Sequence, residues 1–228
     1  MIETDQIPAA MDLDAKRFQD LLGIMENDRI PDGLVADDRH AYFHRLTMPG
    51  SPFAHAEDRP RQGRAVFILE SPHEGPDSYA QRQKLAHVLT GYGVGQFLVV
   101  YLFNLKEGNG LRAWEGPDAA SWDRDAILAA AVRWSQTTPT GRLVPGRVIL
   151  AYGKPPMERR TPWHDADKRV DQILAKLGNP CWGMTKRGGE RFGAAILDAK
   201  VDLFRQSLEL NGLARNRPAV SVAPARRC

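Results

Sequence analysis

The sequence predicts an α/β fold, with three layers arranged as α/β/α around a central, mostly parallel sheet of four strands. Short apolar runs alternate with stretches of helical periodicity along residues 65–210, as in chains that build parallel sheets from strand and helix units. The runs at residues 65–69 and 97–103 are almost uninterrupted, which is typical of strands buried on both faces. Glycine and proline fall in the connectors between these runs.

The totals favour one core with less regular ends. The chain has 228 residues, of which 43% are hydrophobic and 26% charged. No apolar run approaches the roughly 20 residues that span a bilayer, and no basic-then-apolar leader opens the sequence, so we expect a cytoplasmic protein without membrane association. Two cysteines, Cys181 and Cys228, are too few for a four-cysteine cluster or zinc site, and we expect neither metal nor cofactor. The net charge of +3 permits a polyanionic partner, and no obligatory protein partner is inferred.

Residues 1–64 are expected to form a helical extension packed on the core. Apolar residues at helical spacing predict a helix over residues 12–27, which ends before Pro31, Asp32 and Gly33. A second, short helix is predicted over residues 36–46. A connector rich in proline and glycine follows over residues 48–63.

Residues 65–210 form the expected core. The predicted strands are residues 65–69, 97–103, 147–152 and 181–184. The predicted helices are residues 79–90, 122–135, 165–177 and 198–210. We expect Asp118 or Ser121 to cap the helix over 122–135 and Gly178 to end the helix over 165–177. Residues 211–228 are predicted to be a disordered basic tail.

The first strand stops on a carboxylate, Glu70, and Ser71 and Pro72 turn the backbone at once. Open α/β sheets bind ligands at the carboxyl ends of their strands, so Glu70 is predicted to stand at the mouth of a pocket. Loops 70–77, 104–110 and 185–191 are expected to meet at that edge.

The order of these parts resembles the uracil-DNA glycosylase superfamily. In that superfamily the first strand ends in a proline-containing motif with a carboxylate or amide, which Glu70 and Pro72 match here. Its second strand ends in an asparagine that reads the flipped base and precedes a basic residue, and Asn104 and Lys106 fit this pattern. The fourth landmark departs, since residues 184–191 hold no His-Pro-Ser type motif.

The resemblance implies a DNA glycosylase that flips a base out of DNA and hydrolyses its N-glycosidic bond, leaving an abasic site. The sugar becomes oxocarbenium-like in this reaction, so a carboxylate, here Glu70, must orient water and balance positive charge. The candidate donors to the leaving base are His73, Asn104, Lys186 and backbone N–H groups of the glycine-containing loops, and His73 is counted with Glu70 as catalytic. The residues expected to bind the base are Ser71, Pro72, Tyr79 and Asn104. The residues expected to contact DNA phosphates are Lys106, Lys186, Arg187 and Arg191.

The departures from the family pattern bear on the substrate. The altered fourth loop and the additional His73 and Glu74 argue against plain uracil. A damaged or modified base is expected instead, for example a hypermodified phage pyrimidine such as a glucosylated hydroxymethylcytosine. Such a substrate would fit a role in defence against phages.

Other interpretations stay open. Glu70 would also suit a helix cap or a salt bridge, Asn104 a bond to its own turn, and Tyr79 a place in the core. The chain as a whole would also suit a catalytically inactive DNA-binding relative. A module that binds or hydrolyses small nucleotides is a further alternative, although no G-x-x-x-x-G-K-[ST] or G-x-G-x-x-G motif follows a strand.

Overall fold

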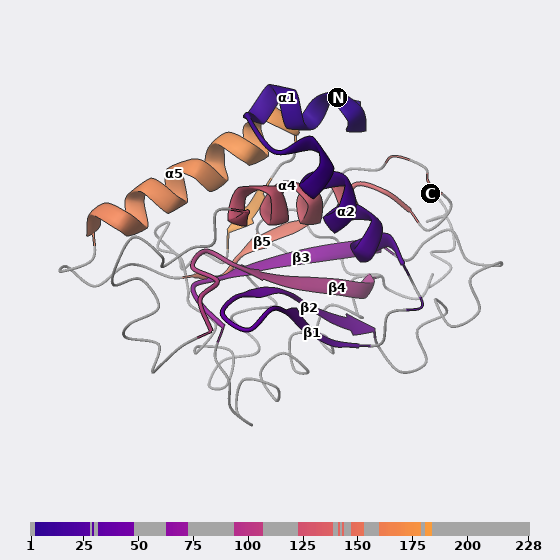
Figure 1. Cartoon of the computed structure of the whole chain (residues 1–228), viewed down its shortest axis with the longest axis horizontal. Helices are drawn as coiled ribbons and strands as arrows, with labels where there is room; N and C mark the ends of the chain where they lie inside the picture. Colours follow the sequence, from indigo (N-terminus) through magenta and orange to yellow (C-terminus); the bar gives the residue numbers. More distant parts are fainter. Residues whose placement is uncertain are drawn as a thin grey trace, which may run out of the picture.

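A six-stranded sheet organises the part of the chain that the computed structural model describes (Figure 1). The described residues are 3–27, 29, 32–47, 63–72, 94–106, 123–138, 141, 143, 147–152, 160–178 and 181–183, with 160–162 and 181–183 described by their backbone alone. The strand order is β1-β2-β4-β3-β5-β6, and helices pack on the sheet, so the fold is mixed α/β. The strands are β1 (Gly33–Ala36), β2 (Ala41–Thr47), β3 (Gly63–Leu69), β4 (Val94–Tyr101), β5 (Val148–Leu150) and β6 (Cys181–Gly183).

Four of these strands, β4, β3, β5 and β6, are parallel neighbours. They confirm the four predicted strands, although β4 both starts and ends earlier than the predicted range 97–103. Val66 of β3 lies opposite Leu98 of β4 and Val148 of β5. All residues of β4 and β5 are buried, as expected for strands with apolar runs inside a parallel sheet. The carboxyl ends of all four strands therefore meet at one edge of the sheet.

The predicted helix over residues 36–46 is wrong, because this segment forms an antiparallel hairpin of β1 and β2. The hairpin pairs with β4 through β2 and raises the strand count from the predicted four to six. Aromatic and β-branched residues such as Tyr42, Phe43 and Thr47 favour a strand. A tight turn separates the strands, since Asp37 Oδ1 accepts hydrogen bonds from the backbone N–H groups of Arg39 (2.8 Å) and His40 (2.6 Å).

The described helices cover one face of the sheet (Figure 1). They are the 3-10 turn η1 (Thr4–Gln6) and the α-helices α1 (Ile7–Met11), α2 (Ala15–Glu26), α4 (Arg124–Ser135) and α5 (Arg160–Lys176). Helices α2, α4 and α5 confirm the helices predicted over residues 12–27, 122–135 and 165–177. Gly178 follows α5 with φ +62°, so its predicted role in ending that helix is confirmed.

The cap of α4 differs from the prediction. The residue in the N-cap position is Asp123, and its side chain makes no capping hydrogen bond. The predicted caps, Asp118 and Ser121, lie outside the described residues. Asp123 instead pairs with Arg17 of α2, as described below.

The main core lies between the helices and the sheet. Alternate strand residues such as Val66, Ile68 and Leu98 pack in one cluster with Trp134 of α4. The other face of the sheet is also buried, and there Phe67 and Phe97 meet edge to face with ring centroids 5.7 Å apart. The helices predicted over 79–90 and 198–210, and the tail over 211–228, lie outside the described residues.

Cationic side chains join elements that are distant in the sequence. The guanidinium of Arg45 in β2, which is 3% exposed, donates to the backbone carbonyls of Asn27 (2.7 Å) and Met25 at the end of α2. At the end of α1, Arg169 of α5 donates to the carbonyl of Met11 (2.9 Å). Lys176 of α5 donates to the carbonyl of Ala10. Carbonyl groups at helix ends have no partner within the helix, so these cations satisfy them.

Candidate active site at the carboxyl edge of the parallel strands

Glu70 follows the last residue of β3, and its backbone is held by the neighbouring strand. The N–H of Leu102 donates to the carbonyl of Leu69, and the N–H of Phe103 donates to the carbonyl of Glu70, both at 2.8 Å. On the other side of β3, the N–H of Ala151 donates to the carbonyl of Ile68 at 2.9 Å. Parallel pairing thus continues past the strand ends and fixes the backbone that carries Glu70.

Glu70 also lies where the order of the strands reverses. The chain passes from β3 to β4 on one side and then returns across β3 to β5 on the other side. Open α/β sheets bind ligands outside the carboxyl ends of strands at such a point. Glu70 and Ser71 are half-buried there, and Pro72 is buried. The structure therefore puts the predicted catalytic carboxylate at the position where this architecture binds ligands.

Asn104 lies at the same edge, one residue beyond the backbone bond between Phe103 and Glu70. It is 1% exposed, and its carbonyl accepts from the N–H of Ala41 at 2.8 Å. The structure thus brings Glu70 and Asn104 to neighbouring strand ends, as the sequence predicted from their places after two apolar runs.

Lys106, a predicted DNA contact, lies against the turn between β1 and β2. Its N–H donates to the carbonyl of Arg39, and its ammonium donates to the carbonyl of Asp37, both at 2.7 Å. Leu105 forms an isolated antiparallel bridge with His40. The turn over residues 37–40 is therefore part of this edge. Sequence reasoning missed it, although two aspartates before an alternating strand-forming segment were a usable signal.

Asp37 is the centre of a polar network that leads back to the helices. The hydroxyl of Tyr42 donates to Asp37 Oδ2 at 2.6 Å. This bond, together with those from the backbone of His40 and Arg39, lowers the pKa of Asp37 to about 2. Burial and the same bond raise the pKa of Tyr42. The guanidinium of Arg17 lies 4.9 Å from the centre of the Tyr42 ring, within the range of a cation–π contact.

Arg17 connects this network to α4. Its Nε and Nη2 both donate to Asp123 Oδ2, at 2.8 and 2.6 Å. The carboxylate is nearly buried, with a side chain that is 3% exposed. Although burial opposes the charge of Arg17, its bond and its attraction to Asp123 raise the pKa of the guanidinium. The turn at the edge is thereby tied to the start of α4.

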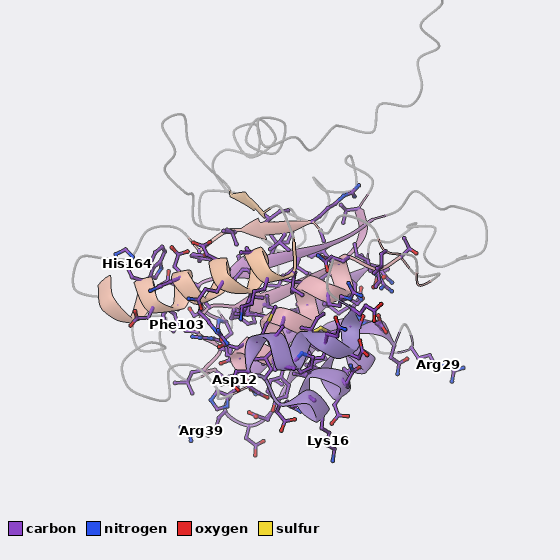
Figure 2. All side chains as sticks on the ribbon, turned by 90° about the horizontal axis from the view of Figure 1, so that it is seen from above. Asp12, Lys16, Arg29, Arg39, Phe103 and His164 are labelled. Atoms are coloured by element: carbon purple, nitrogen blue, oxygen red, sulfur yellow. The ribbon has the colours of Figure 1, made fainter. Side chains whose placement is uncertain are left out.

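An aromatic group lies on the β5 side of the edge. Tyr152 follows β5 and meets Trp163 edge to face at 5.5 Å, and Trp163 meets His164 at the same distance. The hydroxyl of Tyr152 donates to Asp167 at 2.5 Å, so the start of α5 is fixed at the carboxyl end of β5. Figure 2 shows His164, Phe103 and Arg39 toward one end of the molecule and Arg29 toward the other.

Several predicted site residues cannot be placed. His73, Tyr79, Lys186, Arg187 and Arg191 lie outside the described residues. Among the described residues, no group of three or more His, Cys, Asp or Glu side chains is arranged to hold a metal ion. Within the same part of the chain, no helix has the length and apolar character needed to cross a membrane.

A scan against protein-family models found no match for this chain, and searches of curated proteins and of solved structures also found none.

Proposed function

We propose that the protein is a cytoplasmic DNA glycosylase whose catalytic carboxylate is Glu70. The observation that carries the proposal is the position of Glu70 at the reversal point of the parallel sheet, with the buried Asn104 on the neighbouring strand end. In the proposed site, the acid serves hydrolysis of the bond to the base, and the amide serves recognition of that base. The likeness to the uracil-DNA glycosylase superfamily supports the same assignment, and we propose its three-layer architecture for the whole core.

In the proposed reaction, the bond between the anomeric carbon and the base nitrogen breaks, and the base leaves with the electron pair. Glu70 stabilises the positive charge that develops on the sugar and orients the water that bonds to the anomeric carbon. The water loses one proton to solvent as the abasic sugar forms, and the base anion takes up one proton from solvent, so the products are neutral. His73 donates a hydrogen bond to the leaving base, and Asn104 binds the base edge.

The proposed substrate is a modified pyrimidine in DNA, such as a glucosylated hydroxymethylcytosine, in keeping with a role in defence against phages. Tyr79, Ser71 and Pro72 complete the proposed base pocket. The residues proposed to contact DNA phosphates are Lys106, Lys186, Arg187 and Arg191.

Comparison of the wild type with Glu70→Gln tests the proposal. On phage genomic DNA with modified cytosine or thymine, we expect wild type to produce alkali-labile abasic sites without added metal. Glu70→Gln should lower the single-turnover rate by on the order of 10²–10⁴-fold and leave DNA binding largely intact. Glu26→Gln, the same change at an exposed residue of α2, is the control and should retain full activity.

The other interpretations give different results in the same assays. Salt-sensitive DNA binding without abasic sites on a broad panel of duplex and single-stranded DNAs would identify an inactive DNA-binding relative. Absence of any DNA binding would favour a module that acts on small nucleotides. Either result would overturn the glycosylase proposal.

A further inference from the structure

We infer that Asp37 is a positioning residue that fixes residues 104–106 beside Glu70. Its importance for recognition of a base rests on the proposed function, since Asn104 is the proposed base-binding amide.

The first step of the argument is that the carboxylate of Asp37 builds the turn. Oδ1 accepts from two backbone N–H groups, those of Arg39 and His40, at 2.8 and 2.6 Å. The N–H of Asp37 also donates to the carbonyl of His40 at 3.0 Å. An aspartate that bonds the backbone two and three residues onward holds the chain in one turn conformation.

The second step is that this turn holds the segment after β4. The carbonyls of Arg39 and Asp37 accept from the backbone N–H and the ammonium of Lys106, both at 2.7 Å. The N–H of Ala41 donates to the carbonyl of Asn104 at 2.8 Å. Lys106 is thus bonded to the turn and Asn104 to the first residue of β2, so Asn104 cannot shift along the edge without breaking these bonds.

The third step is that the turn itself is anchored. Asp37 Oδ2 accepts from Tyr42, whose ring lies under the guanidinium of Arg17, and Arg17 pairs with Asp123 at the start of α4. Residues 104–106 are therefore held in place relative to the helices as well as to β4. A base-reading amide requires such support, because a displacement of about 1 Å can lower a rate by about 10²-fold.

The hairpin offers a matched control at its opposite end. Asp32 Oδ2 accepts from the N–H of Thr47 at 2.8 Å, so Asp32→Ala also removes one carboxylate bonded to hairpin backbone. Asp32 lies at the end of β1 farthest from the turn, because Gly33 pairs with Arg45. A general loosening of the hairpin should follow from either change, whereas loss of positioning should follow only from Asp37→Ala.

The test measures amide hydrogen exchange and glycosylase activity in the full chain. In Asp37→Ala, we expect the N–H groups of Lys106 and Ala41 to exchange about tenfold faster than in wild type, with no such change in Asp32→Ala. Asp37→Asn keeps the Oδ1 acceptor and should restore most of the protection. The single-turnover rate of Asp37→Ala at saturating DNA should fall about 10-fold to 100-fold with little change in DNA affinity.

The inference would be overturned if the N–H groups of Lys106 and Ala41 exchanged equally fast in Asp37→Ala and Asp32→Ala. It would also be overturned if they exchanged as slowly in Asp37→Ala as in wild type. If Asp37→Ala does not fold, Tyr42→Phe decides, because it removes only the bond to Oδ2. In Tyr42→Phe, the exchange rate of the Lys106 N–H should rise about threefold, while the Thr47 N–H stays protected. An exchange rate of the Lys106 N–H equal to that in wild type would overturn the inference. A wild type that makes no abasic sites would overturn the proposed function instead, and the exchange comparison would still decide whether Asp37 fixes the segment.

Discussion

β3 and β1 belong to the same sheet, yet their side chains have opposite surroundings. The residues from Arg64 to Ile68 are all buried, whereas β1 has only half-buried and exposed residues, with Leu34 38% exposed. The parallel strands are held by burial of apolar side chains on both faces. β1 and the turn rely more on polar contacts, such as those of Asp37, and the mostly buried β2 is held in addition by the bonds of Arg45. Burial of apolar side chains therefore holds the strand that precedes Glu70, whereas hydrogen bonds contribute more to the turn that borders the site.

The largest expected effect is truncation of an aromatic side chain in β3. Phe67→Ala removes a fully buried ring and its edge contact with Phe97, which should lower the free energy of unfolding by about 3–5 kcal/mol. Leu34→Ala in β1 should lower it by less than about 0.5 kcal/mol. Urea unfolding of both variants checks this difference. Similar losses would show that burial does not separate the two regions.

The next effect comes from the polar attachment of the hairpin. Arg45→Met keeps much of the side-chain volume but leaves carbonyls at the end of α2 without their donor. We expect a loss of about 2–3 kcal/mol in unfolding free energy. Arg124→Met, which removes a more exposed arginine paired with Asp125 at 2.8 Å, should lose about 0–1 kcal/mol. Equal losses of unfolding free energy in the two variants would mean that the bonds from Arg45 to α2 stabilise the protein no more than the more exposed pair of Arg124 and Asp125 does.

The smallest effect is a dependence of stability on pH. Because hydrogen bonds from Tyr42 and the turn backbone lower the pKa of Asp37 from 3.8 to about 2, its ionised form is favoured in the folded state. Its contribution is present above about pH 4 and is lost as the pH falls toward 2. The difference in urea midpoint between wild type and Asp37→Asn should therefore shrink between pH 6 and pH 2.5. A difference that stays constant would contradict the assigned ionisation of Asp37.

The sequence predicted the parallel strands well, because a short uninterrupted apolar run such as residues 65–69 is typical of a strand that is buried on both faces of a sheet. It did not predict the hairpin. Residues 36–46 contain apolar and polar side chains at spacings that also fit a short helix, and the choice is made by a pairing with β4, more than 50 residues later in the sequence. Contacts that distant cannot be read from a local window.

The candidate site divides in the same way. Glu70 and Asn104 follow apolar runs, so their meeting at one edge could be predicted from strand ends alone. Asp37 belongs to the mispredicted segment, and its role depends on bonds to Lys106 that no spacing in the sequence reveals. The predictions for His73, Tyr79 and the basic residues of loop 185–191 stay predictions.

The attachment of α1 to α5 has a consequence for the order of folding steps. Arg169 lies 158 positions from Met11, and Lys176 lies 166 positions from Ala10, so these bonds close very long loops of the chain. Contacts between such remote positions form late and slow the final assembly. The docking of α1 on α5 is thus expected among the later steps of folding.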